Sequence, residues 1–93
     1  DVYFICLGEA GLSTALSLTN ELRQSRFNVM FDPLRRSLKA QLREANKSGA
    51  RFALILGDTE MEKGTVVFKD LEKGEQKNIL QKKIKNLFDN LTN

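Results

Sequence analysis

Short apolar runs and helix-spaced apolar residues alternate along the first half of the chain. The runs VYFICL at residues 2–7, NVMF at 28–31 and RFALIL at 51–56 have the length and β-forming content of buried strands. Between them, apolar residues recur at helical spacing and predict one amphipathic helix over about residues 10–25 and another within 35–51. The predicted inner faces are Leu12, Ala15, Leu16, Thr19 and Leu22 in the first helix, and Leu38, Leu42 and Ala45 in the second. With right-handed crossovers, this order gives three parallel strands with helices packed on the sheet.

The second half of the chain follows a different pattern. TVVFKDL at residues 65–71 and EQKNI at 75–79 are separated by EKG, and Gly74 can take the positive φ that a hairpin loop requires, so the pair is predicted to be antiparallel. A last amphipathic helix is predicted from one apolar face, formed by Leu80, Ile84, Leu87, Phe88 and Leu91. The sequence therefore predicts an α/β fold, with a five-stranded mixed sheet flanked by three helices in the order βαβαβββα.

Composition narrows the class of protein and of chemistry. A chain of 93 residues suits a single domain, here 1–93, and the absence of a signal segment and of long apolar runs indicates a cytoplasmic protein without a membrane anchor. The start at Asp1 without methionine is interpreted as a piece of a longer polypeptide. The single cysteine, Cys6, lies in an apolar run and is predicted to be a buried strand residue in a reducing compartment. The lack of histidine excludes the usual general base and the usual zinc ligand, and no metal site is predicted.

The positive charge is concentrated in one predicted helix. Residues 35–51 carry a net charge of +5 and the rest of the chain −2, which together give the +3 of the whole chain. Lys39, Arg43 and Lys47 recur every four residues, on the side of the helix away from Leu38, Leu42 and Ala45. A solvated helix face and a surface for a polyanion both fit this stripe. An anionic membrane fits less well, because the helix has no bulky apolar residue left over to insert.

Two glycine-containing motifs follow predicted strands. GEAG at residues 8–11 lacks the further glycines or the lysine of the phosphate-binding loops, and is predicted to be a tight turn. GDTE at residues 57–60 lies where ligands often bind in α/β sheets, but without further carboxylates or histidine it is predicted to be a solvated acidic loop.

A longer stretch of sequence carries a family resemblance. RSLKAQLREANKSGARFALILGDTEMEKGTVVFKDLEKGEQ, residues 36–76, resembles the C-terminal anticodon-binding domain of class II aminoacyl-tRNA synthetases, and within that group histidyl-tRNA synthetase. The basic helix, the GARFALILG strand, the acidic loop and the hairpin follow in the family's order without gaps. The family's fold has the same five strands and three helices as predicted above.

The resemblance implies a function in tRNA recognition. The domain would bind the anticodon stem-loop of tRNA(His), with anticodon GUG, rather than DNA, while a catalytic domain elsewhere in a homodimeric parent enzyme binds ATP and Mg²⁺. By match to the family's base-reading positions, Arg43, Glu60 and Lys69 would contact anticodon bases, and Arg36, Lys39 and Lys47 would hold the RNA backbone. Another class IIa synthetase, or a synthetase-like regulatory domain that has lost tRNA binding, are the alternatives.

The sequence departs from the family pattern at two positions. Arg35 stands where a glycine usually precedes Arg-Ser-Leu-Lys, and SRFNV at residues 25–29 replaces a small, glycine-containing turn. The first departure bears on base contacts from residues 33–36, and neither bears on catalysis, because the chain has none of the class II catalytic motifs.

Overall fold

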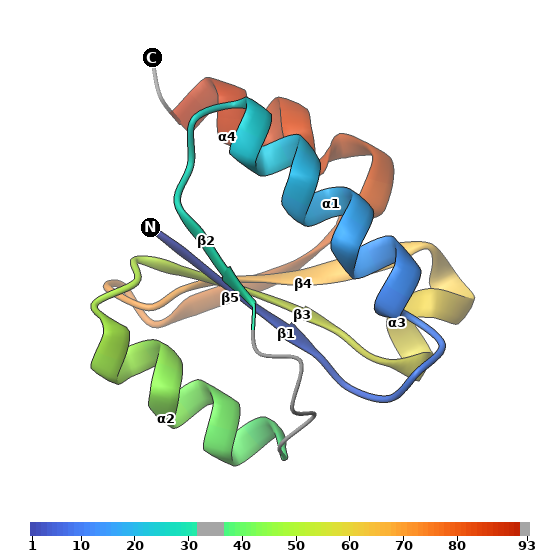
Figure 1. Ribbon diagram of the computed structural model, residues 1–93, viewed down its shortest axis with the longest axis horizontal. Coiled ribbons are helices and arrows are strands. Elements are labelled where there is room, and N and C mark those ends of the chain that lie inside the picture. The colour runs from blue at the N-terminus through green and yellow to red at the C-terminus, as the bar shows by residue number, and fades with distance from the viewer. Residues whose placement is uncertain (32–36, 92–93) are drawn as a thin grey trace.

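The computed structural model of the chain describes residues 1–31 and 37–91. The elements in chain order are β1 (Val2–Cys6), α1 (Leu12–Gln24), β2 (Val29–Phe31), α2 (Leu38–Ser48), β3 (Phe52–Leu56), α3 (Asp58–Lys63), β4 (Thr65–Asp70), β5 (Glu75–Leu80), the 3-10 turn η1 (Gln81–Lys83) and α4 (Ile84–Leu91). The five strands form one sheet in the order β2-β1-β3-β4-β5 (Figure 1). As predicted, β1 is parallel to β2 and β3, and β4 is antiparallel to β5. Strand β4 is also antiparallel to its other neighbour, β3.

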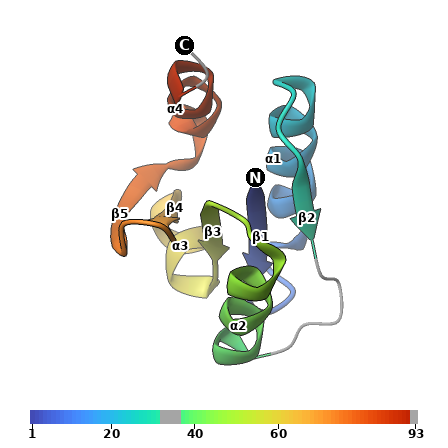
Figure 2. The ribbon, with the colours of Figure 1, turned by 90° about the vertical axis from the view of Figure 1, so that its left-hand side faces the viewer.

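Helices cover both faces of the sheet. Figure 2 shows α1 and α4 on one face and α2 on the other, below β1 and β3. The larger core lies between the sheet and the α1/α4 layer, and a smaller one lies under α2. Cys6 is buried in the larger core, as predicted. The prediction of three helices was wrong, because the described residues contain four, and the additional one, α3, occupies the segment predicted to be an acidic loop.

Helix α1 packs on the sheet along a different line from the one predicted. Ala15, Leu18 and Leu22 are buried, whereas Leu16, predicted to face the core, is 52% exposed. Successive residues of an α-helix are rotated by about 100° around its axis, so the side chain of Leu16 points away from the face on which Ala15 contacts the sheet. The GEAG turn precedes the helix, and a Cβ at Gly11 would come within 3.1 Å of the Leu56 side chain. Glycine therefore allows α1 to begin close against β3.

Helix α4 is attached to the larger core by Phe88. The ring of Phe88 is fully buried and packs edge-on against Phe27, Phe52 and Phe68, with ring centroids 5.0–5.6 Å apart. Leu80 and Leu91, which the sequence pattern placed on the same inner face, are 40% and 46% exposed. Leu80 ends β5, and α4 begins only at Ile84, so the apolar face is shorter than predicted.

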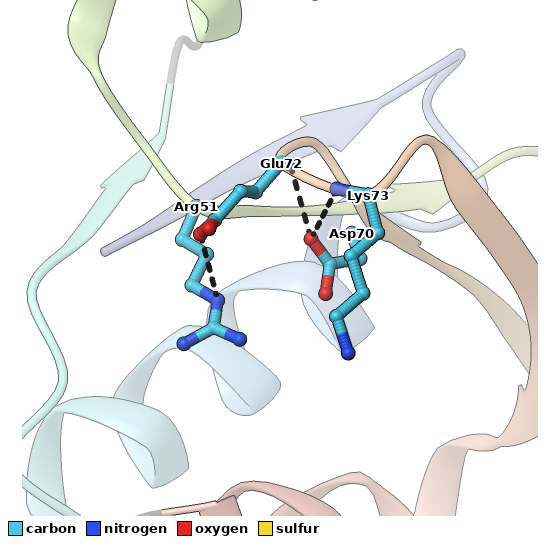
Figure 3. A network of polar contacts seen from close by, with 4 residues as sticks. All are labelled: Arg51, Asp70, Glu72 and Lys73. Carbon is cyan, nitrogen blue, oxygen red and sulfur yellow. Dashed lines mark hydrogen bonds and ion pairs between the residues drawn. The ribbon is translucent and has the colours of Figure 1, made fainter.

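The turn between β4 and β5 is held by Asp70 (Figure 3). The Oδ1 atom of Asp70 accepts hydrogen bonds from the backbone N–H groups of Glu72 and Lys73, both at 3.0 Å. The backbone N–H of Gly74 donates to the Asp70 carbonyl at 2.8 Å, and Gly74 has the predicted positive φ, 75°. A longer contact of 3.6 Å joins Arg51 Nε to the exposed Glu72 carboxylate, so the hydrogen bonds of the buried Asp70 hold the turn more firmly than this ion pair.

Replacing Asp70 tests this assignment. Asp70 is buried, and Asp70→Ala removes the acceptor of two backbone N–H groups. The substitution is therefore expected to lower the free energy of unfolding by about 1–2 kcal/mol. Asp70→Asn keeps one side-chain oxygen as acceptor and should cost less. Urea unfolding of the two variants measures the difference. An unchanged midpoint for Asp70→Ala would contradict the role given to this carboxylate.

Candidate nucleic-acid interface

Helix α2 presents its cations on the side away from the sheet. The buried residues of the helix are Gln41 and Ala45, while Lys39, Arg43 and Lys47 are exposed, as the charge pattern predicted. None of these three cations forms an ion pair with another described residue. Leu38, predicted to face inward, is 38% exposed, and the polar Gln41 takes the inner position one turn before Ala45.

Both ends of α2 are fixed by local structure. The Ser37 hydroxyl accepts a hydrogen bond from the backbone N–H of Ala40 at 3.2 Å and caps the amino end. Gly49 closes the carboxyl end in a left-handed conformation, φ 78°. The charge stripe is therefore carried by a helix of defined length. Arg36, the remaining predicted backbone contact, and Arg35 lie outside the described residues.

Glu60 lies in α3, directly beyond the carboxyl end of β3. Its Oε1 atom accepts a hydrogen bond of 2.8 Å from the backbone N–H of Gly57, the residue that precedes the helix. This contact satisfies one of the free N–H groups at the helix start and fixes the carboxylate at that edge of the sheet. The segment is a helix and not a loop because Glu60 and Gly57 cap its start and Gly64, at φ 68°, ends it.

The capping bond gives Glu60 a structural role that can be separated from any role in binding RNA. Glu60→Gln keeps an oxygen that can accept from Gly57, and is expected to change the free energy of unfolding by less than about 0.5 kcal/mol, whereas Glu60→Ala should cost about 1 kcal/mol. The Gln variant nevertheless loses the negative charge of the side chain. Thermal unfolding of both variants checks the first expectation. Equal destabilisation by Gln and Ala would contradict it.

Lys69 lies on the face of β4 that faces α2. Val66, Phe68 and Asp70 alternate with it and are buried, and the first two belong to the core under α1 and α4. Since successive side chains of a strand point to opposite faces, Lys69 and Val67 point to the α2 side. Lys69 is half-buried there and forms no ion pair with another described residue.

Two amide side chains share this face with Lys69. Gln76 is the partner of Lys69 in the register of β4 and β5, and Asn78 is the partner of Val67. Both are exposed, because α2 lies below β1 and β3 and leaves β4 and β5 uncovered (Figure 2). The sequence analysis missed both residues. The alternation of residues within TVVFKDL separates the two faces of β4. Which residues of β5 lie opposite Lys69 and Val67 depends, however, on the length of the turn between the two strands.

The predicted base contacts are spread along the sheet and do not converge on one point. Glu60 follows the carboxyl end of β3, whereas Lys69 is paired with Ala53, three residues before that end at Leu56. At about 3.3 Å per residue, this places the two positions about 10 Å or more apart along the strand direction. Arg43 lies midway along α2, on the same side of the sheet as Lys69. Such an arrangement can contact several nucleotides, but not one base with all three side chains.

Within residues 1–31 and 37–91, no group of three or more histidine, cysteine, aspartate or glutamate side chains could hold a metal ion. In the same ranges, no helix is both long and apolar enough to span a membrane. The chemistry available at this surface is that of cations, amides and one oriented carboxylate. These groups bind phosphates and the hydrogen-bonding edges of bases.

We compared the chain with models of known protein families to identify its family. The profile of the family described as "Anticodon binding domain" matches residues 1–92, nearly the whole chain. The chain belongs to this family. The resemblance found in residues 36–76 is thereby confirmed, and it extends over both halves of this anticodon-binding domain.

Curated relatives of the domain are named histidine–tRNA ligases. One from Thermotoga petrophila is 43% identical over 75 residues, which cover 81% of this chain and 18% of the relative. Another, from Natranaerobius thermophilus, is 43% identical over 76 residues, covering 82% of this chain and 18% of the relative. The domain thus matches less than a fifth of the length of these proteins.

Solved structures agree with the fold. Histidyl-tRNA synthetase from S. aureus superimposes with a TM-score of 0.87 at 28% identity, over 96% of this chain and 23% of the other. The enzyme from Nostoc sp. PCC 7120 gives 0.86 at 28% identity, over 97% of this chain and 21% of the other. The RNA-binding domain of threonyl-tRNA synthetase from Cryptosporidium parvum gives 0.84 at 18% identity, over 97% and 23%, which shows a shared fold alone.

Proposed function

We propose that this domain binds the anticodon stem-loop of tRNA(His) as part of a histidine–tRNA ligase. The observation that carries the proposal is the exposed cationic stripe of α2, which has no acidic partner among the described residues, in a domain whose 43%-identical relatives are histidine–tRNA ligases. The parent enzyme would supply the ATP- and Mg²⁺-dependent attachment of histidine, as a homodimer in the cytoplasm. The domain itself selects the tRNA.

The cations of α2 would hold the RNA backbone. Lys39 and Lys47, together with Arg36, are positioned for phosphate, which supplies affinity that falls with salt but carries no sequence information. Their exposure means that binding need not displace a protein ion pair. Arg43 lies between Lys39 and Lys47 and can donate to a phosphate or to the acceptor edge of a base.

Glu60 would read a guanine. Gly57 holds Oε1, so the carboxylate is oriented before RNA arrives, and an ionised carboxylate has acceptor capacity beyond that one hydrogen bond. The N1 and N2 hydrogens of an unpaired guanine are donors of the matching kind. Lys69, on the uncovered sheet face, would donate to a second base, and Gln76 and Asn78 lie beside it with amides that can pair with either kind of edge.

Titration with labelled RNA tests the proposal against its nearest alternatives. The 93-residue chain is mixed with stem-loops of one backbone that carry anticodons for histidine, threonine, proline or glycine, and fluorescence anisotropy gives Kd. Tightest binding is expected for the GUG loop. Preference for one of the other loops would assign the domain to another class IIa synthetase, and absence of binding to all of them would favour the synthetase-like regulatory domain.

A further inference from the structure

The turn that follows α1 contains an arginine in an unfavourable backbone conformation. Arg26 has φ 71°, and it is the one non-glycine residue with positive φ among those described. The turn is closed by hydrogen bonds from Arg26 N–H to the Arg23 carbonyl at 3.0 Å and from Phe27 N–H to the Leu22 carbonyl at 3.1 Å. Glycine is the residue that usually takes this position after a helix, because a side chain there is strained.

Two guanidinium groups lie beside this turn. Arg23 Nη2 donates a hydrogen bond of 2.9 Å to the Val29 carbonyl, and Phe27 is packed on Phe88, so the side chains come from a rigid segment. Both arginines border a surface hollow of about 370 Å³. Its lining residues are Arg23, Arg26, Phe27, Asn28, Val29 and Met30, and none of them is acidic.

Two carboxylates of the described residues lie close to the hollow, and neither forms an ion pair with Arg23 or Arg26. Asp1 Oδ2 accepts from the backbone N–H of Asn28 at 3.4 Å. Asp89, on α4, accepts from Lys85 Nζ at 3.2 Å, and its hydrogen bonds with Ser25 and Lys85 hold the pKa of this carboxyl below its usual value. A cation at the carboxyl end of a helix is ordinarily explained by the helix dipole, and that explanation suffices for Arg23. It does not explain a strained arginine beyond the helix end.

The hollow lies at the edge of the sheet toward which α2 runs. Helices α1 and α2 both end where parallel strands begin, since α1 leads to Val29 and α2 leads to Phe52. Lys47 in the last turn of α2 is therefore at the same edge of the sheet as Arg23 and Arg26, whereas Glu60 is at the opposite edge. Helices α1 and α2 cover opposite faces of the sheet (Figure 2), so an RNA stem that leaves a loop near Glu60 and follows α2 reaches the hollow by passing around this edge.

We propose that Arg23 and Arg26 form a second phosphate-binding site, which holds the backbone of the tRNA stem outside the anticodon loop. The site rests on the proposed function, since it presumes that the domain binds tRNA. Guanidinium groups bind phosphate oxygens through paired N–H donors, and a hollow of this size accommodates a phosphodiester group. The contact contributes affinity and salt dependence without base preference.

Arg26→Gly is the decisive variant, because it removes the charge while placing glycine in the conformation that favours it. Its Tm is expected to equal or exceed that of the unmodified chain by a few degrees. Its Kd for the tRNA(His) transcript should rise about 3- to 10-fold, and the slope of log K against log salt should become shallower by about one. Arg26→Lys should restore most of the affinity. The ratio of affinities for GUG and altered anticodons should stay unchanged.

Lys83→Gln serves as the control, because it removes one exposed charge from η1, which lies alongside α1 and does not line the hollow. Equal Kd values for Arg26→Gly and the unmodified chain, or equal losses for Arg26→Gly and Lys83→Gln, would overturn the site. If inorganic phosphate raises the Tm of the unmodified chain but not of Arg26→Gly, while tRNA affinity is the same for both, the hollow takes free phosphate and the RNA assignment is wrong. If the unmodified chain does not bind tRNA(His), both the site and the proposed function fail.

Discussion

Arg43→Glu is expected to weaken binding of the tRNA(His) stem-loop by about 10- to 100-fold, which corresponds to the loss of one charged contact to RNA and the repulsion that replaces it. Arg43 lies in the middle of the exposed stripe, between Lys39 and Lys47, so a negative charge there acts on the whole stripe. The side chain is exposed, and reversal of its charge should change the free energy of unfolding by no more than about 0.5 kcal/mol.

Charge reversal at another exposed lysine controls for net charge. Lys83→Glu, in η1 on the other side of the sheet, changes the net charge by the same amount and is expected to change Kd by no more than about twofold at physiological salt, where distant charges are screened. Anisotropy titrations of both variants at one salt concentration give the comparison. Similar losses for the two variants would show that overall charge, and not α2, governs binding.

Phe88→Ala is expected to lower the free energy of unfolding by about 3–5 kcal/mol, because it removes a fully buried ring and leaves a cavity among Phe27, Phe52 and Phe68. For a domain of this size, that loss corresponds to a fall in Tm of more than about 12 °C. Leu91→Ala in the same helix is the matched control, since Leu91 is 46% exposed, and it should cost less than about 1 kcal/mol. A small effect of Phe88→Ala would mean that α4 is not held by this cluster.

The sequence predicted the five strands and their order along the chain, because each strand has a strong local pattern. VYFICL and FALIL are continuous apolar runs, and both strands are buried on every residue. Gly74 was predicted to take a positive φ in the hairpin loop, and it does. The antiparallel pairing of β4 with β5 followed from the short EKG connection.

Where the prediction was wrong, the determining contacts are between residues that no short pattern joins. Helix α3 has six residues and none of them is buried, so no periodic pattern of apolar residues could reveal it. The hydrogen bond between Gly57 and Glu60 that caps its start cannot be recognised in the sequence, where the segment reads as an acidic loop. Leu16 and Leu38 were placed inward because leucine is apolar, but the line along which each helix meets the sheet is set by packing as a whole.

The candidate site was predicted in part. The stripe on α2 could be read from spacing, since Lys39, Arg43 and Lys47 recur every four residues and are all exposed. Gln76 and Asn78 could not be found, because their place beside Lys69 depends on the register of β5. Arg26 was noted only as part of a turn that departs from the family pattern, and its positive φ is a property of the fold.

The most direct test of the account uses one stem-loop in which only the anticodon is changed. The 93-residue chain is titrated with the GUG loop and with two loops in which either guanine is replaced by adenine, at a fixed salt concentration. Adenine lacks the N2 hydrogens and the N1–H that a carboxylate accepts, so at least one replacement is expected to raise Kd by about 5-fold or more, a loss of about 1 kcal/mol. Glu60→Gln should reduce that discrimination. Equal affinity for all three loops would contradict the central claim that this surface reads the anticodon of tRNA(His).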